Sequence, residues 1–275
     1  DASKALLEFS RQGLDAAETL RRTNDALTLT RLAGLGAEAS VAALTATVNG
    51  FSKSGLTTTQ VLNKLVAVEQ SFAVSARDLS EGLARTGQAA QEAGINIDQL
   101  NALISAAQQR TARGGAVIGN ALKTIFTRLQ RSDTLDRLEE FNIAVRDVQG
   151  NTLPAAAVLQ NFVNAYDRLA DAQRSQLSEQ VAGVYQVNIL KAIISDLNSE
   201  QSVYTAALEK GARASNEAER ANAQLNQSLS ALLTQLGNNT QQLASQIGSV
   251  TFDPLAKSAA KAANSILETF TDLLT

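Results

Sequence analysis

The sequence predicts an all-α protein, a multi-helix array of amphipathic helices that we expect to be elongated. Apolar residues recur every three or four positions over much of the chain, which is the period of a helix with one buried face. Only 2 prolines occur in 275 residues, so long uninterrupted helices are allowed. Hydrophobic residues make up 44% of the chain but aromatic residues only 4%, so the core must consist of small and medium side chains that suit close helix packing.

The composition also narrows the possible chemistry. The sequence has no Cys, Met, His or Trp, which excludes a Ser-His-Asp triad, a thiolate nucleophile, a His/Cys zinc site and a disulfide. The net charge of −3 argues against a strongly basic nucleic-acid binder. No apolar run approaches the roughly 18 residues of a membrane span. We therefore expect no enzymatic activity, no cofactor or metal, no small-molecule substrate, no specific nucleic-acid binding and no membrane span.

Three segments are predicted: an N-terminal helical segment at 1–50, a core helical domain at 51–197, and at 198–275 a long helix followed by a proline-broken helical hairpin or coiled coil. In the first segment, "GLGAEA" matches the G-x-G-x-x-A pattern through Gly34 and Gly36. A dinucleotide site needs a buried strand before those glycines. The preceding residues are polar and helix-like, so we interpret the glycines as a joint between two helices.

Helix starts in the core segment carry recognisable capping signals. Thr57 and Gln60 have the spacing of a capping box, and Asn96 and Gln99 repeat it. Pro154 is expected in the first turn of a further helix, where its missing N–H costs nothing. Each cap contributes about 1 kcal/mol, so these signals mainly fix where helices begin.

Three apolar stripes follow one another along the core segment, each at helical spacing. The first consists of Val117, Ile118, Ala121, Leu122, Ile125, Phe126 and Leu129. The second consists of Val158, Leu159, Phe162, Val163, Tyr166 and Leu169. The third consists of Leu177, Val181, Val184, Ile189 or Leu190, Ile193 and Leu197. Between the first two, "IAVRDVQGN" alternates and then reaches Gly150-Asn151, which predicts one minor β-hairpin or loop near 143–151.

Gly115 and Gly119 form a G-x-x-x-G pattern at the start of the first stripe. In lipid this pattern would indicate helix dimerisation, but here its flanks are polar. We predict instead that the two glycines let this helix pack closely against a neighbouring helix.

Between Asn198 and Gly237 the chain contains no proline and a single glycine, Gly211. A single long helix is therefore expected there. Asp253-Pro254 is expected to open a last helix as a cap and a first-turn proline. Heptad-like spacing joins Leu225, Leu229, Leu232, Leu236, Leu243, Ile247 and Val250. These residues are either a self-association seam with other copies of the chain or a stripe that packs on a neighbouring helix of the same fold.

The order of several segments resembles the core region of phage tail tape measure proteins. The resemblance rests on "VIGNALKTIFTRLQ" followed by "LEEFNIAVRDVQGNTLPAAAVLQNF", on the Ala93-Gly94 step upstream, and on the helix, proline break and second helix downstream; it covers roughly Leu44 to Phe270. It implies an ordered part of a larger protein, which agrees with the missing start methionine at Asp1. No catalytic residue carries over.

The resemblance implies a structural component of the virion, made in the cytoplasm of the bacterial host. A tape measure protein sets the length of the tail and sits in the tail tube or tip until it is released during DNA ejection. Its partners would be the tail-tube and tail-tip proteins and further copies of itself, which we expect to form a trimer.

Two other classes remain open. Self-assembling helical proteins of the flagellin or chemoreceptor kind share the Ala/Gln/Ser/Leu bias, although they show longer unbroken heptads. A cell-wall-cleaving enzyme would need a cleft with a carboxylate, because His and Cys are unavailable to it.

Overall fold

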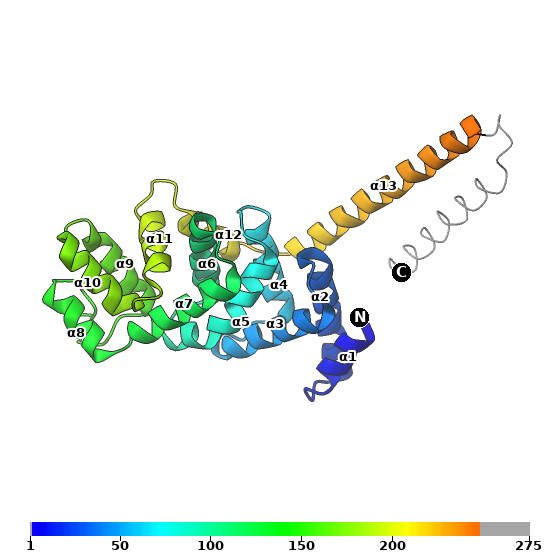
Figure 1. The fold of residues 1–275 in the computed structure, drawn as a ribbon. Helices are drawn as coiled ribbons and strands as arrows, with labels where there is room; N and C mark the ends of the chain where they lie inside the picture. Colours follow the sequence, from blue (N-terminus) through cyan, green and yellow to red (C-terminus); the bar gives the residue numbers. More distant parts are fainter. Residues whose placement is uncertain (1, 248–275) are drawn as a thin grey trace. The chain divides into compact units, whose positions relative to one another are not determined.

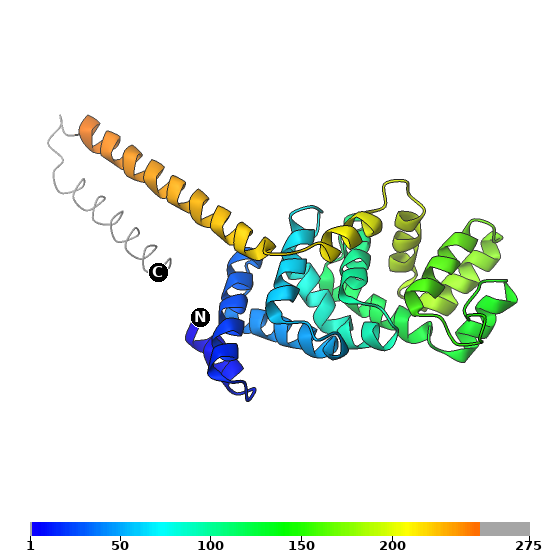
Figure 2. The same ribbon diagram turned by 180° about the vertical axis from the view of Figure 1, so that it is seen from behind.

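The computed structural model describes residues 2–247, without the side chains of residues 233, 234 and 236–247. The chain forms two compact units, Asp1–Ala218 and Glu219–Thr275, which we call unit 1 and unit 2 and treat separately. The described residues contain helices and one isolated β-bridge, so the predicted all-α, multi-helix fold is confirmed (Figures 1 and 2).

The helices of unit 1 are α1 (Ala2–Ser10), α2 (Ala16–Ala33), α3 (Ala37–Gly50), the 3-10 helix η1 (Ser52–Ser54), α4 (Thr58–Glu69), α5 (Ala76–Glu92), α6 (Ile97–Thr111), α7 (Gly115–Arg128), α8 (Ser132–Glu140), α9 (Ala155–Tyr166), α10 (Asp171–Ala182), α11 (Val187–Leu197) and α12 (Val203–Ala212). From α1 to α10 the helices of unit 1 broadly follow one another in chain order, and α11 and α12 then return to pack against α6 (Figure 1). Helix α13 (Glu217–Ile247) begins in the last residues of unit 1 and forms the described part of unit 2.

Capping residues define the helix starts much as predicted. Both capping boxes are present, at Thr57 with Gln60 and at Asn96 with Gln99. Pro154 is the N-cap of α9, one position earlier than the predicted first turn. The N–H of the following residue donates to the carbonyl of Ala93 at 2.9 Å, so the end of α5 is joined to the start of α9.

The two glycines of "GLGAEA" lie between α2 and α3. Gly34 ends α2 with a φ of 62°, a left-handed conformation that favours glycine, and Gly36 is the N-cap of α3. The segment before them is a helix and not a buried strand, so the dinucleotide reading of the motif is excluded here.

Helix α6 lies at the centre of the packing. It contacts α4, α5, α7, α11 and α12, and an unbroken run of its residues from Leu100 to Ala107 is buried. Helix α5 packs against α3 as well as α7, and the backbones of α3 and α5 come close at Gly50 and Gly87, where a Cβ added to Gly50 would lie 3.1 Å from the backbone of Gly87. Small residues therefore set the spacing of these helices, as the low aromatic content predicts.

Most residues of the three predicted stripes are buried, but two valines are not. Val117 is 46% exposed, because it lies about 100° around α7 from Ile118 and outside the buried strip that continues along the helix. Val184 is 72% exposed, because α10 ends before Gly183 and Val184 falls in the turn to α11. The prediction that these two valines belong to the buried stripes was wrong.

The predicted minor hairpin is present as a tight turn with one antiparallel bridge, between Arg146 and Thr152. The N–H of Leu153 donates to the carbonyl of Val145 at 2.8 Å. Within the turn, the Asn151 side-chain amide donates to one carboxylate oxygen of Asp147, and the backbone N–H groups of Asn151 and Gln149 donate to the other. These hydrogen bonds, that of the Asn151 side chain first, lower the pKa of the Asp147 carboxyl from its usual value.

The single helix expected from Asn198 onward is broken, and that prediction was wrong. The residues after α11 form a turn, α12 begins at Val203, and the chain bends again between Arg213 and Asn216 before α13. Asn216 adopts a φ of 57°, a left-handed conformation that interrupts a right-handed helix. Neither break needs proline or glycine, which is why the sequence pattern concealed them.

Candidate functional site

Two glycines of α7 bring its backbone against that of α5. A Cβ added to Gly115 would lie 1.8 Å from the carbonyl oxygen of Asp78, and one added to Gly119 would lie 2.9 Å from the Cα and carbonyl oxygen of Gly82. The Thr86 hydroxyl donates to the carbonyl of Gly119 at 2.6 Å, and this bond is buried. The two helices therefore cross at a separation that only glycine permits at these positions.

Side chains fix the start of α7 as well as its spacing. The N–H of Gly115 donates to Asp78 Oδ1 at 2.9 Å, and the N–H of Gly114 donates to Gln108 Oε1 at 2.9 Å. Gly114 has a φ of 80°, so the residue before α7 must also tolerate a left-handed conformation. Hydrogen bonds to side chains of α5 and α6 therefore hold Gly114 and Gly115 in place.

A second constellation attaches the N-terminal end of α12. Asp196, at the end of α11, is only 1% exposed. Its carboxylate accepts hydrogen bonds from the Ser202 hydroxyl at 3.0 Å, from the Val203 N–H at 3.2 Å and from the Tyr204 N–H at 2.9 Å. Arg110 Nε lies 3.5 Å from its Oδ1. A single buried carboxylate therefore joins α11, α12 and the end of α6.

The C-terminal end of α12 is attached by a lysine. Lys64 Nζ of α4 donates to both carboxylate oxygens of Asp98, at 2.8 and 2.9 Å, and to the carbonyl of Gly211 at 2.9 Å. Asn63, which precedes Lys64 in α4, also holds the chain after α12: its Oδ1 accepts a hydrogen bond from the N–H of Ala218 at 3.0 Å. Cation-to-carbonyl contact at a helix C-terminus is favourable because the last carbonyl groups carry partial negative charge.

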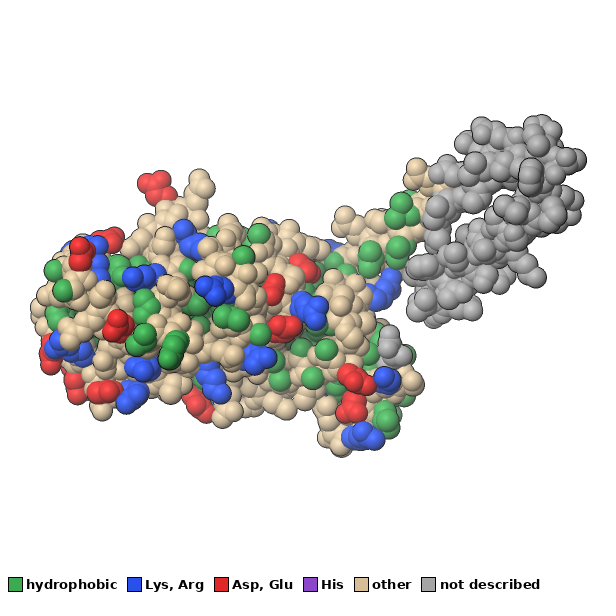
Figure 3. Space-filling model, in the orientation of Figure 1, with side chains coloured by type: hydrophobic (Ala, Val, Ile, Leu, Met, Phe, Trp, Pro, Cys, Tyr) green, Lys and Arg blue, Asp and Glu red, His purple; other side chains and the backbone are tan. Residues whose placement is uncertain are grey.

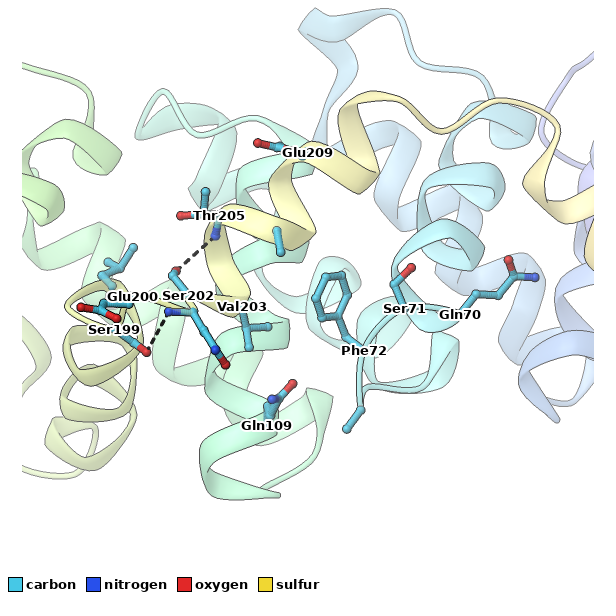
Figure 4. A pocket seen from close by; sticks show the side chains of 14 residues that line it. Gln70, Ser71, Phe72, Gln109, Ser199, Glu200, Ser202, Val203, Thr205 and Glu209 are labelled. Atoms are coloured by element: carbon cyan, nitrogen blue, oxygen red, sulfur yellow. Dashed lines mark hydrogen bonds between the residues drawn. The ribbon is translucent and has the colours of Figure 1, made fainter.

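A groove of ≈ 880 Å³ runs between α12 and the loop that joins α4 to α5 (Figure 4). Phe72 projects toward α12 from the loop, and Val203 and Gln109 line the opposite side and the floor (Figure 4). A second hollow of ≈ 320 Å³ shares Phe72 with the first and extends toward Lys210. Helix α12 packs against α6, α4 and α11, and the groove leaves its flank toward Phe72 open.

Two titratable groups near the groove have pKa values shifted by burial. Burial raises the pKa of Glu69, partly offset by a hydrogen bond that its carboxylate accepts from the Ala76 N–H at 2.8 Å. Burial also raises the pKa of the Tyr204 phenol. Glu200 and Glu209 line the groove among amides and hydroxyls, with no His or Cys available in the sequence to activate a nucleophile.

The surface gives no stronger indication of chemistry. On the face of unit 1 shown in Figure 3, acidic and basic side chains are interspersed. Among the described residues, no three His, Cys, Asp or Glu side chains are grouped so that they could hold a metal ion. Within the same residues, no helix has both the length and the apolar character needed to cross a membrane.

The predicted self-association seam is only partly within the described residues. Leu225 and Leu229 are half-buried, and Leu232 is 55% exposed. The side chains of Leu236, Leu243 and Ile247 lie outside the described residues, as do Val250 and the Asp253-Pro254 cap. Self-association through this seam stays a prediction.

Comparison with models of protein families places most of the chain in a known family. A family model described as "Phage-related minor tail protein" matches residues 1–183, which span α1 to α10 and end at the turn before α11. No solved structure matches the chain.

Proposed function

The chain belongs to the phage-related minor tail protein family, and from that membership we propose that it is part of a tail tape measure protein. In this role it would help to set the length of the tail and would remain in the tail tube or tip until DNA ejection. The observation that carries the proposal is the family match over residues 1–183, more than half of the chain.

The helical construction supports this role. A helix converts residue number into distance at about 1.5 Å per residue, so chain length can specify a distance without any chemistry. Helix α13 alone has 31 residues. In unit 1, the contacts at the α5–α7 crossing and at α12 hold backbone groups in place. They do not position a reacting group. We therefore propose a mechanical role with no catalytic residue.

The proposal includes self-association and contacts with other tail proteins. The exposed Leu232 lies on the heptad-like stripe of α13, where an apolar side chain is available to a second copy. We propose three copies in each tail, with the tail-tube and tail-tip proteins as the other partners.

Quantitative mass spectrometry of purified particles tests location, copy number and release together. Isotope-labelled peptides from this chain and from the tail-tube protein are used as internal standards, before and after DNA ejection is triggered. We expect the chain in isolated tails at three copies per particle, and we expect most of it to be lost from emptied tails while the tube protein is retained.

The tube protein is the matched control, because it reports any loss of whole tails. If this chain is missing from isolated tails, or remains in full after ejection, the proposed role is wrong. A different copy number would contradict only the proposed trimer.

A further inference from the structure

Residues 199–218, which we call the strap, comprise α12 and the short segments on either side of it. The strap contributes few apolar groups to the core: its fully buried residues are Val203, Ala207, Gly211 and Ala218, while its larger side chains Tyr204 and Leu208 are only partly buried. Burial of apolar surface scales with side-chain size, so the strap gains less from packing than α6 beneath it does.

Polar side chains from the body of unit 1 hold the strap at both ends. Asp196 binds its N-terminal end through three hydrogen bonds, and Lys64 binds its C-terminal end at the carbonyl of Gly211. Lys64 is itself paired with Asp98 of α6. Such contacts are directional, and unlike packing they are replaced by water once the groups separate.

The strap is also poorly supported along one flank. The two hollows of ≈ 880 and ≈ 320 Å³ lie between it and the loop that carries Phe72. Side chains that line such open hollows face water and bury less apolar surface. Helix α12 therefore packs against α6, α4 and α11 but stays open to solvent on the flank toward Phe72.

We infer that the strap is a release element, which detaches from α6 before the rest of unit 1 unfolds. A helix of 10 residues is too short to persist alone in water, so the detached strap would become an extended chain. Twenty extended residues span up to about 70 Å. Release would allow the chain after Leu197 to be drawn out along a tail. This purpose rests on the proposed function.

Hydrogen exchange measured by mass spectrometry on the full chain tests detachment. We expect amides of α12 to exchange at least about a hundredfold faster than those of α6. Replacing Lys64 by Met should raise the exchange rate of the α12 amides by about a further tenfold, because a charge-assisted hydrogen bond is lost. The amides of α6 should be accelerated much less, although Asp98 of α6 also loses its partner. The matched control is Lys53→Met, which replaces an exposed lysine of η1 and should change the exchange of neither helix.

Equal protection of α12 and α6 in the unaltered chain would overturn the inference, and so would an equal acceleration of both helices by Lys64→Met.

Force spectroscopy gives a second, independent measurement. Because the chain has no cysteine, Ser3→Cys and Glu219→Cys supply unique handles on the full chain. The first extension step should release about twenty residues, and a single step that unfolds unit 1 as a whole contradicts early release. Neither measurement involves a phage particle, so its failure is distinct from failure of the proposed function.

Discussion

Replacing Gly115 by Ala is expected to destabilise unit 1 by about 3 kcal/mol or more, which is at or above the upper end for overpacking of a core. The added Cβ would lie 1.8 Å from the carbonyl oxygen of Asp78 and 2.5 Å from its carbonyl carbon. Both are backbone atoms, so no side chain can rotate away and α7 must move off α5. That movement also lengthens the hydrogen bond from the Gly115 N–H to Asp78.

Urea denaturation followed by circular dichroism measures this effect. The matched control is Gly36→Ala, because Gly36 has no atom within 4 Å of an added Cβ and no left-handed backbone conformation. Gly36 is an N-cap, so its replacement should cost less than about 1 kcal/mol. Equal denaturation midpoints for the two variants would show that the close α5–α7 crossing does not exist in solution.

Replacing Asp196 by Ala should release α12 and lower the free energy of unfolding by about 3 kcal/mol, as expected when one partner of a buried charged network is removed. The change leaves two backbone N–H groups, the Ser202 hydroxyl and the Arg110 guanidinium without their shared acceptor. Hydrogen exchange should then show α12 largely unprotected while α6 stays protected.

Asp136→Ala is the matched control. Asp136 is an exposed carboxylate with a single 3.6 Å contact to Arg146, so its removal should cost less than about 1 kcal/mol. Asp196→Asn should fall between the two, since the amide keeps one acceptor oxygen. If Asp196→Ala retains the protection of α12, the buried carboxylate does not hold the strap.

The sequence predicts those parts of the fold that depend on neighbouring residues. The capping boxes at Thr57 and Asn96 are local hydrogen-bond patterns, and most of the apolar stripes follow from the helical period alone. Gly115 and Gly119 were predicted to permit close packing, but their partner Asp78 lies 37 residues away from Gly115, so no local pattern could identify it.

The two attachments of α12 escaped prediction for different reasons. Asp196 is one of 27 acidic residues, and nothing in the local sequence distinguishes it from a solvated one. Lys64 reaches Gly211 across 147 residues, and Asn63 reaches Ala218 across 155. The break before α12 is local, because Ser202 caps the helix by accepting from the Thr205 N–H and Asp196 bonds the same turn. The sequence analysis missed that cap, whereas the attachment of the C-terminal end depends on the long-range contacts of Lys64 and Asn63.

The length of the assembled tail tests most directly whether this chain measures distance. An insertion of 84 residues after Leu232, made of six copies of residues 219–232, extends the heptad-like part of α13. If the added residues form a helix along the tail, electron microscopy should show tails longer by about 126 Å, at 1.5 Å per residue. A flexible insertion of equal length beside Val148, whose side chain is 96% exposed in the tight turn, should form a side loop and leave the length unchanged. Intact, infectious particles whose tails keep their original length after the α13 insertion would contradict a length-setting role.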